Sequence, residues 1–526
     1  MVYHSKFSDL NVPKDLSLYD LIFEPKRIEM HRDKLLFVDV EDPRNCLTFS
    51  QAHELILKAG FAFQTKLGLN KGDVIAICSP NHIHYPVVMF GALCVGGISA
   101  AIEYTSSPER IISDMNTVRP KIIIAHPESL NNVLEAVKNY NNNEVTVLVF
   151  RKQDINDARA VDTFLFNGNE LAKPYSYAPE DIAKSPAYLY FTSGTTGAKK
   201  AVMISQYMMV RTLMLTDSLK IPMPSILAYT EFHHASSLAT ALIQSFFLGY
   251  TVYVMPHYTF EGLCTAIESH KVGMMITQPY VLSALARDQV AAKHNLSSLK
   301  SVVCCGAASS QDVISDAKER LGLAVFNVYA MTEIIGMFTV TPTVSNAGGV
   351  GYLSGGFSAK LIDEEGNEVP TGQTGELLIK GPTLMPGYYR NPEATAKAFD
   401  SDGFFRTGDL FRINEDGCFH YVGRGKDLIK YKLHHIYPVE IEAILMSHPK
   451  VSDCAVIGVY QPELVTEVPR AYVSLVDTQK HNDAIVNEII EYANSHLPDE
   501  KRLRGGLIVI DAFPRNSTGF SAFETP

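Results

Sequence analysis

The stretch of the chain best suited to chemistry is rich in glycine and hydroxyl side chains and reads YFTSGTTGAKK, from Tyr190 to Lys200. Glycines let backbone amides approach an anion closely, serine and threonine hydroxyls add donors, and the two lysines supply positive charge. The pattern favours a phosphate-binding loop, with a structural turn as the alternative for this segment taken alone. A P-loop is disfavoured, because the spacing of four residues before a Gly-Lys-Ser/Thr triplet is not met.

Further motifs follow this loop along the chain. They read CCGAASS (Cys304–Ser310), NVYAMTE (Asn327–Glu333), GELLIKGPTLMPGYYRNPEATAKAF (from Gly375), FFRTGDL (from Phe404) and YVGRGKDLIKYK (from Tyr421). In this order, and together with the glycine-rich loop, they resemble motifs of the adenylate-forming superfamily, in the branch that contains 4-coumarate:CoA ligases, other acyl-CoA ligases and beetle luciferases. The resemblance covers essentially the whole chain, and chance does not account for so many motifs in order.

The resemblance implies a site for ATP. Tyr329 would stack on adenine, which suits a flat aromatic face, and Asp409 would accept hydrogen bonds from both ribose hydroxyls. Arg424 would reach the ribose or a phosphate. The expected nucleotide-binding residues are Thr192, Ser193, Gly194, Thr195, Thr196, Gly197, Asn327, Val328, Tyr329, Ala330, Met331, Thr332, Asp409 and Arg424.

The resemblance also assigns residues to catalysis and to a metal ion. Thr332 would touch the α-phosphate, and Glu333 would help to hold Mg²⁺, a hard cation that prefers carboxylate oxygen. The expected catalytic residues are Lys200, Thr332, Glu333, His233 and Lys430. Any of the charged residues taken alone could be a solvated surface group, and it is their shared motif context that favours the functional interpretation.

A pocket for the acid is expected around YTEFHHASS, from Tyr229 to Ser237, which resembles the FHxxG segment of the family. Its two histidines would gate the pocket or contact the substrate carboxylate, with a satisfied core histidine as the alternative. Small residues at Ala307 and Ala330 would leave room for a ring or chain. The expected substrate-binding residues are Tyr229, His233, His234, Gly306, Ala307 and Ala330.

Relatives in this superfamily turn a small C-terminal domain between an adenylating and a thioester-forming orientation, and the resemblance places the hinge at Lys426. Lys430 and Lys432 would then serve the active site or the coenzyme A face, with ordinary surface lysines as the alternative. The expected coenzyme A-binding residues are Lys432 and Leu433.

Two positions depart from the family pattern. The usual C-terminal lysine, in a PxxxTGK signature, is Phe520 in the segment PRNSTGF, and the usual glycine of IKYKG is Leu433. Removing one donor to developing charge typically costs about 2.7 to 4 kcal/mol. The first change therefore predicts slow adenylation or a substitute cation, and the second puts thioester formation in doubt, because close backbone approach is expected there.

Periodicity predicts the strands and helices that carry these motifs. Short β-branched runs at 74–79, 121–126 and 145–150 alternate with amphipathic stretches such as 50–67, which favours parallel sheets with helices on their faces. The apolar stretch 87–102 is expected to form a buried helix and turn, and the vicinal Cys304 and Cys305 to lie in a strand with reduced thiols.

The expected fold is α/β. A large N-terminal domain of doubly wound sheets, with a β-rich subdomain from about residue 350, would span residues 1–424, and a small mobile α+β domain would span 425–526. The length of 526 residues requires at least two domains. The boundary follows Arg424, where a compact polar stretch succeeds a strand-like run.

Composition restricts the partners. A formal charge of −11 without long basic runs argues against nucleic acid and favours a small-molecule partner, here a carboxylic acid. We expect no signal peptide, no membrane span, a cytoplasmic location, and a monomer or homodimer.

The sequence therefore predicts ATP-dependent activation of an aryl or fatty carboxylic acid as an acyl-adenylate, followed by transfer to coenzyme A, with ATP, Mg²⁺ and coenzyme A as cofactors. One alternative is a repurposed family member that binds nucleotide or acyl-CoA but adenylates poorly, which Phe520 and Leu433 favour. A luciferase-like oxygenation of the acyl-adenylate is a third, weaker alternative.

Overall fold

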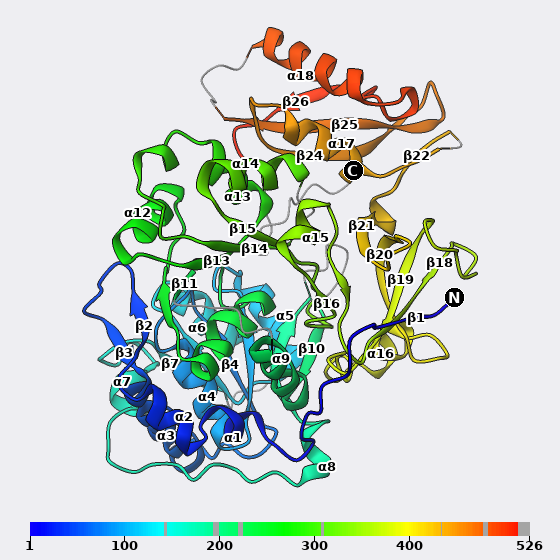
Figure 1. The fold of residues 1–526 in the computed structure, drawn as a ribbon. Helices are drawn as coiled ribbons and strands as arrows, with labels where there is room; N and C mark the ends of the chain where they lie inside the picture. Colours follow the sequence, from blue (N-terminus) through cyan, green and yellow to red (C-terminus); the bar gives the residue numbers. More distant parts are fainter. Residues whose placement is uncertain are drawn as a thin grey trace.

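The computed structural model describes residues 1–140, 145–192, 199–218, 225–306, 310–432, 434–476 and 482–513. Within these ranges the chain forms two seven-stranded sheets, a five-stranded sheet and a three-stranded sheet, with helices packed between and around them (Figure 1). The predicted α/β class is confirmed. No helix of the described ranges is long and apolar enough to cross a membrane.

The first seven-stranded sheet has the order β10-β9-β5-β4-β6-β7-β8 and is parallel except where β9 meets β10. Its strands are β4 (Val74–Cys78), β5 (Ile98–Ile102), β6 (Ile122–Ala125), β7 (Thr146–Val149), β8 (Arg159–Ala160), β9 (Pro186–Phe191) and β10 (Ala201–Ser205). β4, β5 and β6 are buried at every position, as expected of parallel strands whose two faces are both covered. The strands predicted from the three β-branched runs are confirmed as β4, β6 and β7.

Helices beside this sheet are α3 (Phe49–Lys66), α4 (Tyr85–Cys94), α5 (Pro108–Val118) and α6 (Leu130–Asn139). α3, which confirms the predicted helix, begins with a capping box in which Thr48 and Gln51 exchange side-chain and backbone hydrogen bonds. α4 is buried along its whole length and packs closely on α3. The absence of a side chain at Gly91 permits this approach, because a Cβ there would lie only 2.8 Å from Ala59 Cβ. The expectation of a helix and turn over 87–102 was wrong for its last residues, which pair with β4 as strand β5.

The second seven-stranded sheet has the order β15-β14-β13-β11-β12-β2-β3 and is parallel except at the β2–β3 edge. Its strands are β2 (Leu35–Asp39), β3 (Cys46–Thr48), β11 (Ser225–Ala228), β12 (Thr251–Val254), β13 (Met274–Thr277), β14 (Ser301–Cys304) and β15 (Ala324–Asn327). The accompanying helices are α9 (Gln206–Ser218), the π-helix η1 (Leu238–Gln244), α11 (Ser245–Leu248), α12 (Phe260–His270), α13 (Pro279–Arg287) and α14 (Gln311–Leu321). Cys304 ends β14, as predicted, whereas Cys305 follows the strand, and all the described cysteines are free.

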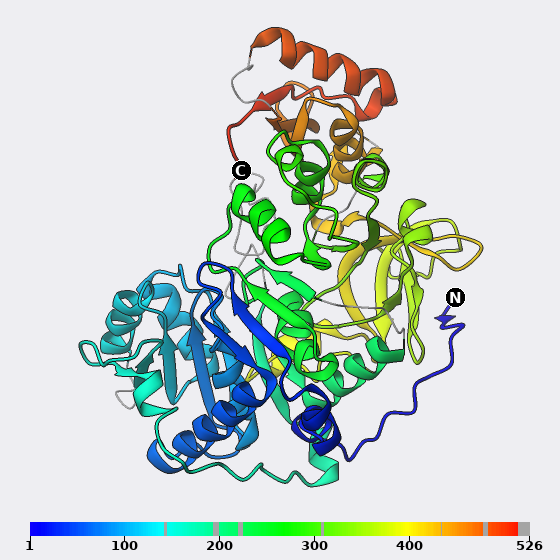
Figure 2. The same ribbon diagram turned by 60° about the vertical axis from the view of Figure 1, so that its left-hand side comes forward.

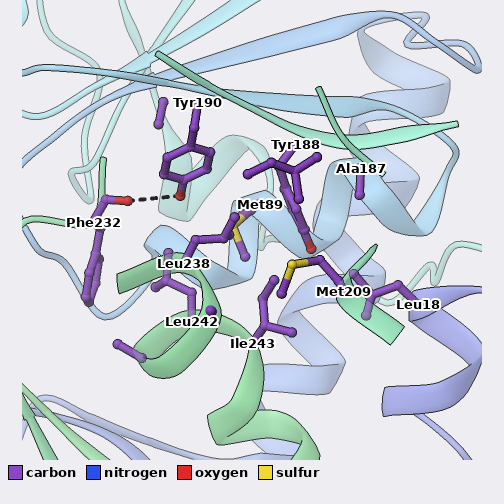
Figure 3. Packing of buried hydrophobic residues seen from close by; sticks show 14 of the residues in the cluster. Leu18, Met89, Ala187, Tyr188, Tyr190, Met209, Phe232, Leu238, Leu242 and Ile243 are labelled. Atoms are coloured by element: carbon purple, nitrogen blue, oxygen red, sulfur yellow. Dashed lines mark hydrogen bonds between the residues drawn. The ribbon is translucent and has the colours of Figure 1, made fainter. Parts of the chain in front are cut away.

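A continuous apolar core joins these two sheets (Figure 3). Tyr188 and Tyr190 of β9 point toward Met209 of α9 and Leu238 of η1 in this view. The Tyr190 hydroxyl donates a hydrogen bond of 2.9 Å to the carbonyl of Phe232. The strand that leads into the predicted phosphate loop is thereby tied to the backbone just before the two histidines.

The five-stranded sheet has the order β1-β18-β19-β20-β21 and is antiparallel. Its strands are β1 (Tyr3–His4), β18 (Ser358–Ile362), β19 (Thr374–Lys380), β20 (Phe405–Ile413) and β21 (Phe419–Arg424). It is the β-rich subdomain expected after about residue 350, seen in yellow in Figure 1. The first residues of the chain join its edge, which sequence reasoning did not foresee.

The C-terminal part stands above the rest of the molecule, against the green helices (Figure 2). It contains β22 (Ile429–Tyr431), β23 (His434–Ile436), α17 (Pro438–Ser447), β24 (Val451–Gln461), β25 (Thr466–Leu475), α18 (Asp483–His496) and β26 (Leu507–Val509). Arg287 of α13 donates a hydrogen bond of 2.8 Å to the carbonyl of Met446, and apolar side chains of both parts share one cluster. The division at residue 424 stays a prediction.

Shorter elements complete the described chain. They are α1 (Leu18–Ile22), α2 (Pro25–His31), α7 (Val161–Phe164), α8 (Pro179–Ile182), α10 (Ala235–Ser237), η2 (Ala291–Lys293), β16 (Phe338–Thr339), α15 (Pro342–Asn346), β17 (Tyr352–Leu353), α16 (Pro392–Ala398), η3 (Gly425–Asp427) and η5 (Asp499–Lys501).

Candidate active site

A cavity of about 1240 Å³ lies where the second seven-stranded sheet, the five-stranded sheet and the C-terminal part meet. The residues that follow the carboxyl ends of β13, β14 and β15 line it, as is usual for ligand sites in parallel sheets. η1, β20, β21 and the region after β22 supply the other sides. The predicted nucleotide-binding segment Asn327–Glu333 lies along this cavity in full.

One end of the cavity is built by Tyr329, Asp409, Tyr421 and Arg424, which we call the ribose corner. Asp409 and Arg424 stand directly opposite each other on β20 and β21. The Tyr329 hydroxyl donates a hydrogen bond of 2.6 Å to Asp409 Oδ2, and Arg424 Nε lies 3.5 Å from Asp409 Oδ1. The Tyr329 and Tyr421 rings are stacked with centroids 5.8 Å apart.

At the ribose corner, burial and hydrogen bonding shift the pKa of Asp409 in opposite directions. Burial raises the pKa of the Asp409 carboxyl, while the Tyr329 hydroxyl and the Arg424 guanidinium oppose the rise. Burial, together with Asp409, raises the pKa of Tyr329, so that its hydroxyl remains a donor. The corner therefore presents an oriented carboxylate and a flat aromatic face, the two groups that a nucleoside requires.

Glu333 occupies a buried position beside the same segment. The Tyr388 hydroxyl donates a hydrogen bond of 3.0 Å to Glu333 Oε1, and the Tyr388 ring faces Lys200 Nζ, 4.9 Å from its centroid. Burial raises the pKa of Glu333, and Lys200 opposes that rise. A carboxylate held in this way, with a cation nearby, suits a divalent ion and phosphate oxygens.

The two ends of the predicted phosphate loop are close together. Thr192 N donates to the Lys200 carbonyl at 2.9 Å, and Lys200 N donates to Thr192 Oγ1 at 3.3 Å. Lys199 Nζ lies 2.9 Å from Glu103 Oε2. The antiparallel strands β9 and β10 therefore hold the two ends of the loop together. Its predicted contact residues Ser193, Gly194, Thr195, Thr196 and Gly197 lie outside the described residues.

Residues 229–244, which we call the acid wall, form another side of the cavity. His234 lines it, whereas Tyr229 and His233 are not among the described lining residues. Tyr229, at the start of the wall, is buried, and its hydroxyl donates to Gln278 Oε1 at 2.8 Å and lies 2.9 Å from Thr277 Oγ1. Tyr229 therefore does not line the cavity in this structure, and its contact with substrate stays a prediction.

His233 is buried, as a core histidine would be, but neither of its ring nitrogens makes a hydrogen bond. Burial lowers its pKa to about 3, so that the ring is neutral. Glu231, two residues earlier, has its pKa raised to about 7 by burial and by the nearby Glu103. Of the alternatives for His233, a satisfied core histidine does not match this arrangement.

The remaining predicted residues divide into three groups. Gly306, Ala330 and Lys426 line the cavity, and Gly306 has the positive φ of 92° that favours glycine. Lys430 and Lys432 lie on and just after β22 and are not among the described lining residues. Ala307, Leu433 and Phe520 lie outside the described residues.

Sequence reasoning missed two residues that position the site. Asn81, buried after β4, lies within hydrogen-bonding distance of the carbonyls of Ala228, Thr230 and Met255 and accepts from Phe232 N at 2.7 Å. Tyr388, which holds Glu333, belongs to the quoted GYYR motif but was given no role. An amide side chain three residues after a buried strand is the signal that could have identified Asn81.

Comparison with known proteins identifies the family. Residues 25–389 match the model of the AMP-binding enzyme family, and residues 440–519 match that of the AMP-binding enzyme C-terminal domain. The chain belongs to the AMP-binding enzyme family. The resemblance found in the motifs is thereby confirmed.

Relatives match the chain over nearly its whole length. Probable 4-coumarate–CoA ligase 3 of Dictyostelium discoideum is 30% identical over 98% of this chain and 96% of its own. Luciferin 4-monooxygenase of Photinus pyralis is 28% identical over 94% and 90%. The structure of the anthranilate CoA ligase AuaEII in complex with anthranoyl-AMP superposes with a TM-score of 0.88, at 22% identity over 97% of this chain and 96% of that one. At that identity the structural likeness shows the fold.

Proposed function

We propose that this enzyme uses ATP to activate a carboxylic acid, of aryl or fatty type, as an acyl-adenylate, and then passes the acyl group to coenzyme A. The observation that carries the proposal is the ribose corner, in which Asp409 is oriented by Tyr329 and Arg424 at one end of a cavity large enough for a nucleotide and an acid. The names of the relatives, which include a 4-coumarate–CoA ligase and an anthranilate CoA ligase, support it.

The reaction would proceed in two displacements. In the first, a carboxylate oxygen of the acid attacks the α-phosphorus of ATP and pyrophosphate leaves. In the second, the thiol of coenzyme A loses its proton and attacks the acyl carbon, and AMP leaves. In the first step Asp409 and Arg424 would hold the ribose, Thr332 would contact the α-phosphate, and Lys200 would offset charge on the phosphate oxygens.

Glu333 fits a magnesium ion. Its carboxylate is buried beside Tyr388, which holds one of its two oxygens, and carboxylate oxygen is the ligand that Mg²⁺ prefers. When bound, the ion supplies neutralising charge to the phosphate groups.

The coenzyme A half-reaction depends on the C-terminal part. Lys426 lies in η3, between β21 and β22, and lines the cavity. We propose that it is the hinge, and that turning about it brings Lys432 and Leu433 to the cavity for thioester formation. The cytoplasmic location and the monomeric or homodimeric state remain predictions.

A second candidate function is a repurposed protein that binds nucleotide or acyl-CoA but adenylates poorly. Phe520 at the usual lysine position favours it. Acid-dependent release of pyrophosphate, measured over a panel of aryl and fatty acids with and without coenzyme A, separates the two. Release with at least one acid, followed by thioester formation, supports the ligase, whereas a folded protein that binds ATP but releases no pyrophosphate with any acid supports the alternative.

A further inference from the structure

Three side chains of the acid wall bring their polar atoms to one place. Glu231, His233 and His234 each offer an atom that can bind a metal, and these atoms lie within 4.8 Å of one another. Glu231 Oε2 is 3.2 Å from His233 Nε2 and 3.7 Å from His234 Nε2. Two ligand atoms at roughly 2.0–2.2 Å from a tetrahedral zinc ion stand about 3.3–3.6 Å from each other. Both distances in the protein are therefore close to the separation of two ligands of one zinc ion.

A second observation points to a missing partner for His233. The residue is 8% exposed, and neither ring nitrogen makes a hydrogen bond, although Nε2 is close to the Glu231 carboxylate. A buried polar group without a partner destabilises the folded state, because the group has lost its hydrogen bonds to water. A metal ion bound at Nε2 would provide a partner, and the neutral form of the ring is the form that binds metals.

The backbone that carries these side chains is fixed independently of any ligand. His234 N donates to the Glu231 carbonyl at 3.0 Å, which closes a turn around Phe232. Asn81 holds the same turn by accepting from Phe232 N. The three side chains therefore start from a rigid segment, which lowers the entropic cost of binding an ion.

The surrounding charges also permit a cation. Lys199 is the nearby positive group, and its ammonium is paired at 2.9 Å with Glu103, both side chains being largely buried. The pair is neutral as a whole, which leaves the carboxylate of Glu231 as the charge that an incoming ion would meet.

We propose that Glu231, His233 and His234 form a binding site for a divalent transition metal of the zinc class, with three protein ligands and a fourth position that faces the cavity. His234 lines the cavity, so that water or a small carboxylate can complete the shell there. Two imidazoles with one carboxylate suit Zn²⁺, whereas Mg²⁺ prefers oxygen ligands alone. The site is therefore distinct from the magnesium position proposed at Glu333, and it does not depend on the proposed function.

Binding of Zn²⁺ to the chelator-treated full-length protein, measured by calorimetry in excess Mg²⁺, tests the site without ATP or an acid. We expect saturable binding that weakens at least about tenfold in Glu231→Gln and in His234→Gln. His257→Gln is the matched control, because His257 also lies between two carboxylates, those of Glu41 and Glu128, the latter shared with His126, but on the surface and outside the one group of converging ligand atoms found in the described residues. Its Zn²⁺ affinity should equal that of the unsubstituted protein.

Circular dichroism of each variant shows whether it is folded. If Glu231→Gln does not fold, His234→Gln, whose side chain lies on the cavity side, provides the test instead. Co²⁺ in place of Zn²⁺ should give the intense visible absorption of a four-coordinate site, and acetate should perturb it if the fourth position is open. Absence of Zn²⁺ binding to the unsubstituted protein overturns the proposal. So does an affinity that is unchanged in the folded variants.

Discussion

At the ribose corner Asp409 has both Tyr329 and Arg424 as partners, whereas on the acid wall His233 is buried with neither ring nitrogen hydrogen-bonded. The two regions face the same cavity, and both contain a titratable group whose pKa burial shifts. The nucleotide end is therefore preorganised for its ligand by side chains of the protein itself. The acid wall instead holds a buried imidazole that no hydrogen bond within the described chain orients.

Glu333→Gln should produce the largest effect, because it removes the charge proposed to hold Mg²⁺ at the preorganised end. We expect pyrophosphate release at saturating ATP and acid to fall roughly 100-fold, with a higher requirement for Mg²⁺. Glu393→Gln removes an exposed carboxylate that pairs with Lys397 on α16, and it should leave the rate unchanged. Equal rates in the two variants would show that Glu333 is not part of the site.

Asp409→Ala tests the ribose corner itself. Calorimetry should show ATP binding at least about tenfold weaker, or about 1.4 kcal/mol, because the carboxylate that accepts the ribose hydroxyls is lost. Asp416→Ala is the control, since Asp416 accepts from Tyr352 in the turn between β20 and β21, on the same hairpin. An unchanged affinity in a folded Asp409→Ala protein would remove the ribose assignment.

Phe520→Lys tests whether the cation missing from the family signature limits the rate; Phe520 lies outside the described residues. If the enzyme is limited by the missing cation, an ammonium at this position should raise acid-dependent pyrophosphate release by roughly tenfold, because it stabilises charge developing on phosphate and carboxylate oxygens. Phe520→Met is the control for loss of the aromatic ring without added charge, and it should not raise the rate.

Phe520→Lys could instead lower the stability of the protein without raising the rate. If the site has been rebuilt for another task, Phe520→Lys would place a charge without a partner among apolar neighbours, and the melting temperature should fall with no gain in rate. That result would favour the repurposed alternative over the ligase.

The same comparison explains how much could be predicted from the sequence. Asp409 and Arg424 could be named from the sequence because each lies in a continuous family motif, and the structure adds that they face each other on one hairpin. The environment of His233 was not, because it depends on Asn81 and on Tyr190, which reach the wall from other strands far along the chain. The two-residue strand β1 is too short for any periodic signal, and its place is set by pairing with β18.

Ala330→Leu should produce the smallest effect. It tests where along the cavity the ribose corner ends and the space for the acid begins. Ala330 follows Tyr329 directly, lines the cavity and is exposed to it, so that a leucine would take space from the acid while leaving the ribose corner intact. Because the cavity is open here, the cost should stay near the lower end for overfilled sites, about 1 kcal/mol or roughly fivefold in kcat/KM, and only for the larger acids of the panel. The KM for ATP should not change.

Ala330→Ser, which adds little volume, is the control and should retain the original acid preference. If Ala330→Leu instead weakens ATP and leaves the ranking of acids untouched, the acid does not pass this residue, and the pocket for it must lie on the η1 side of the cavity alone.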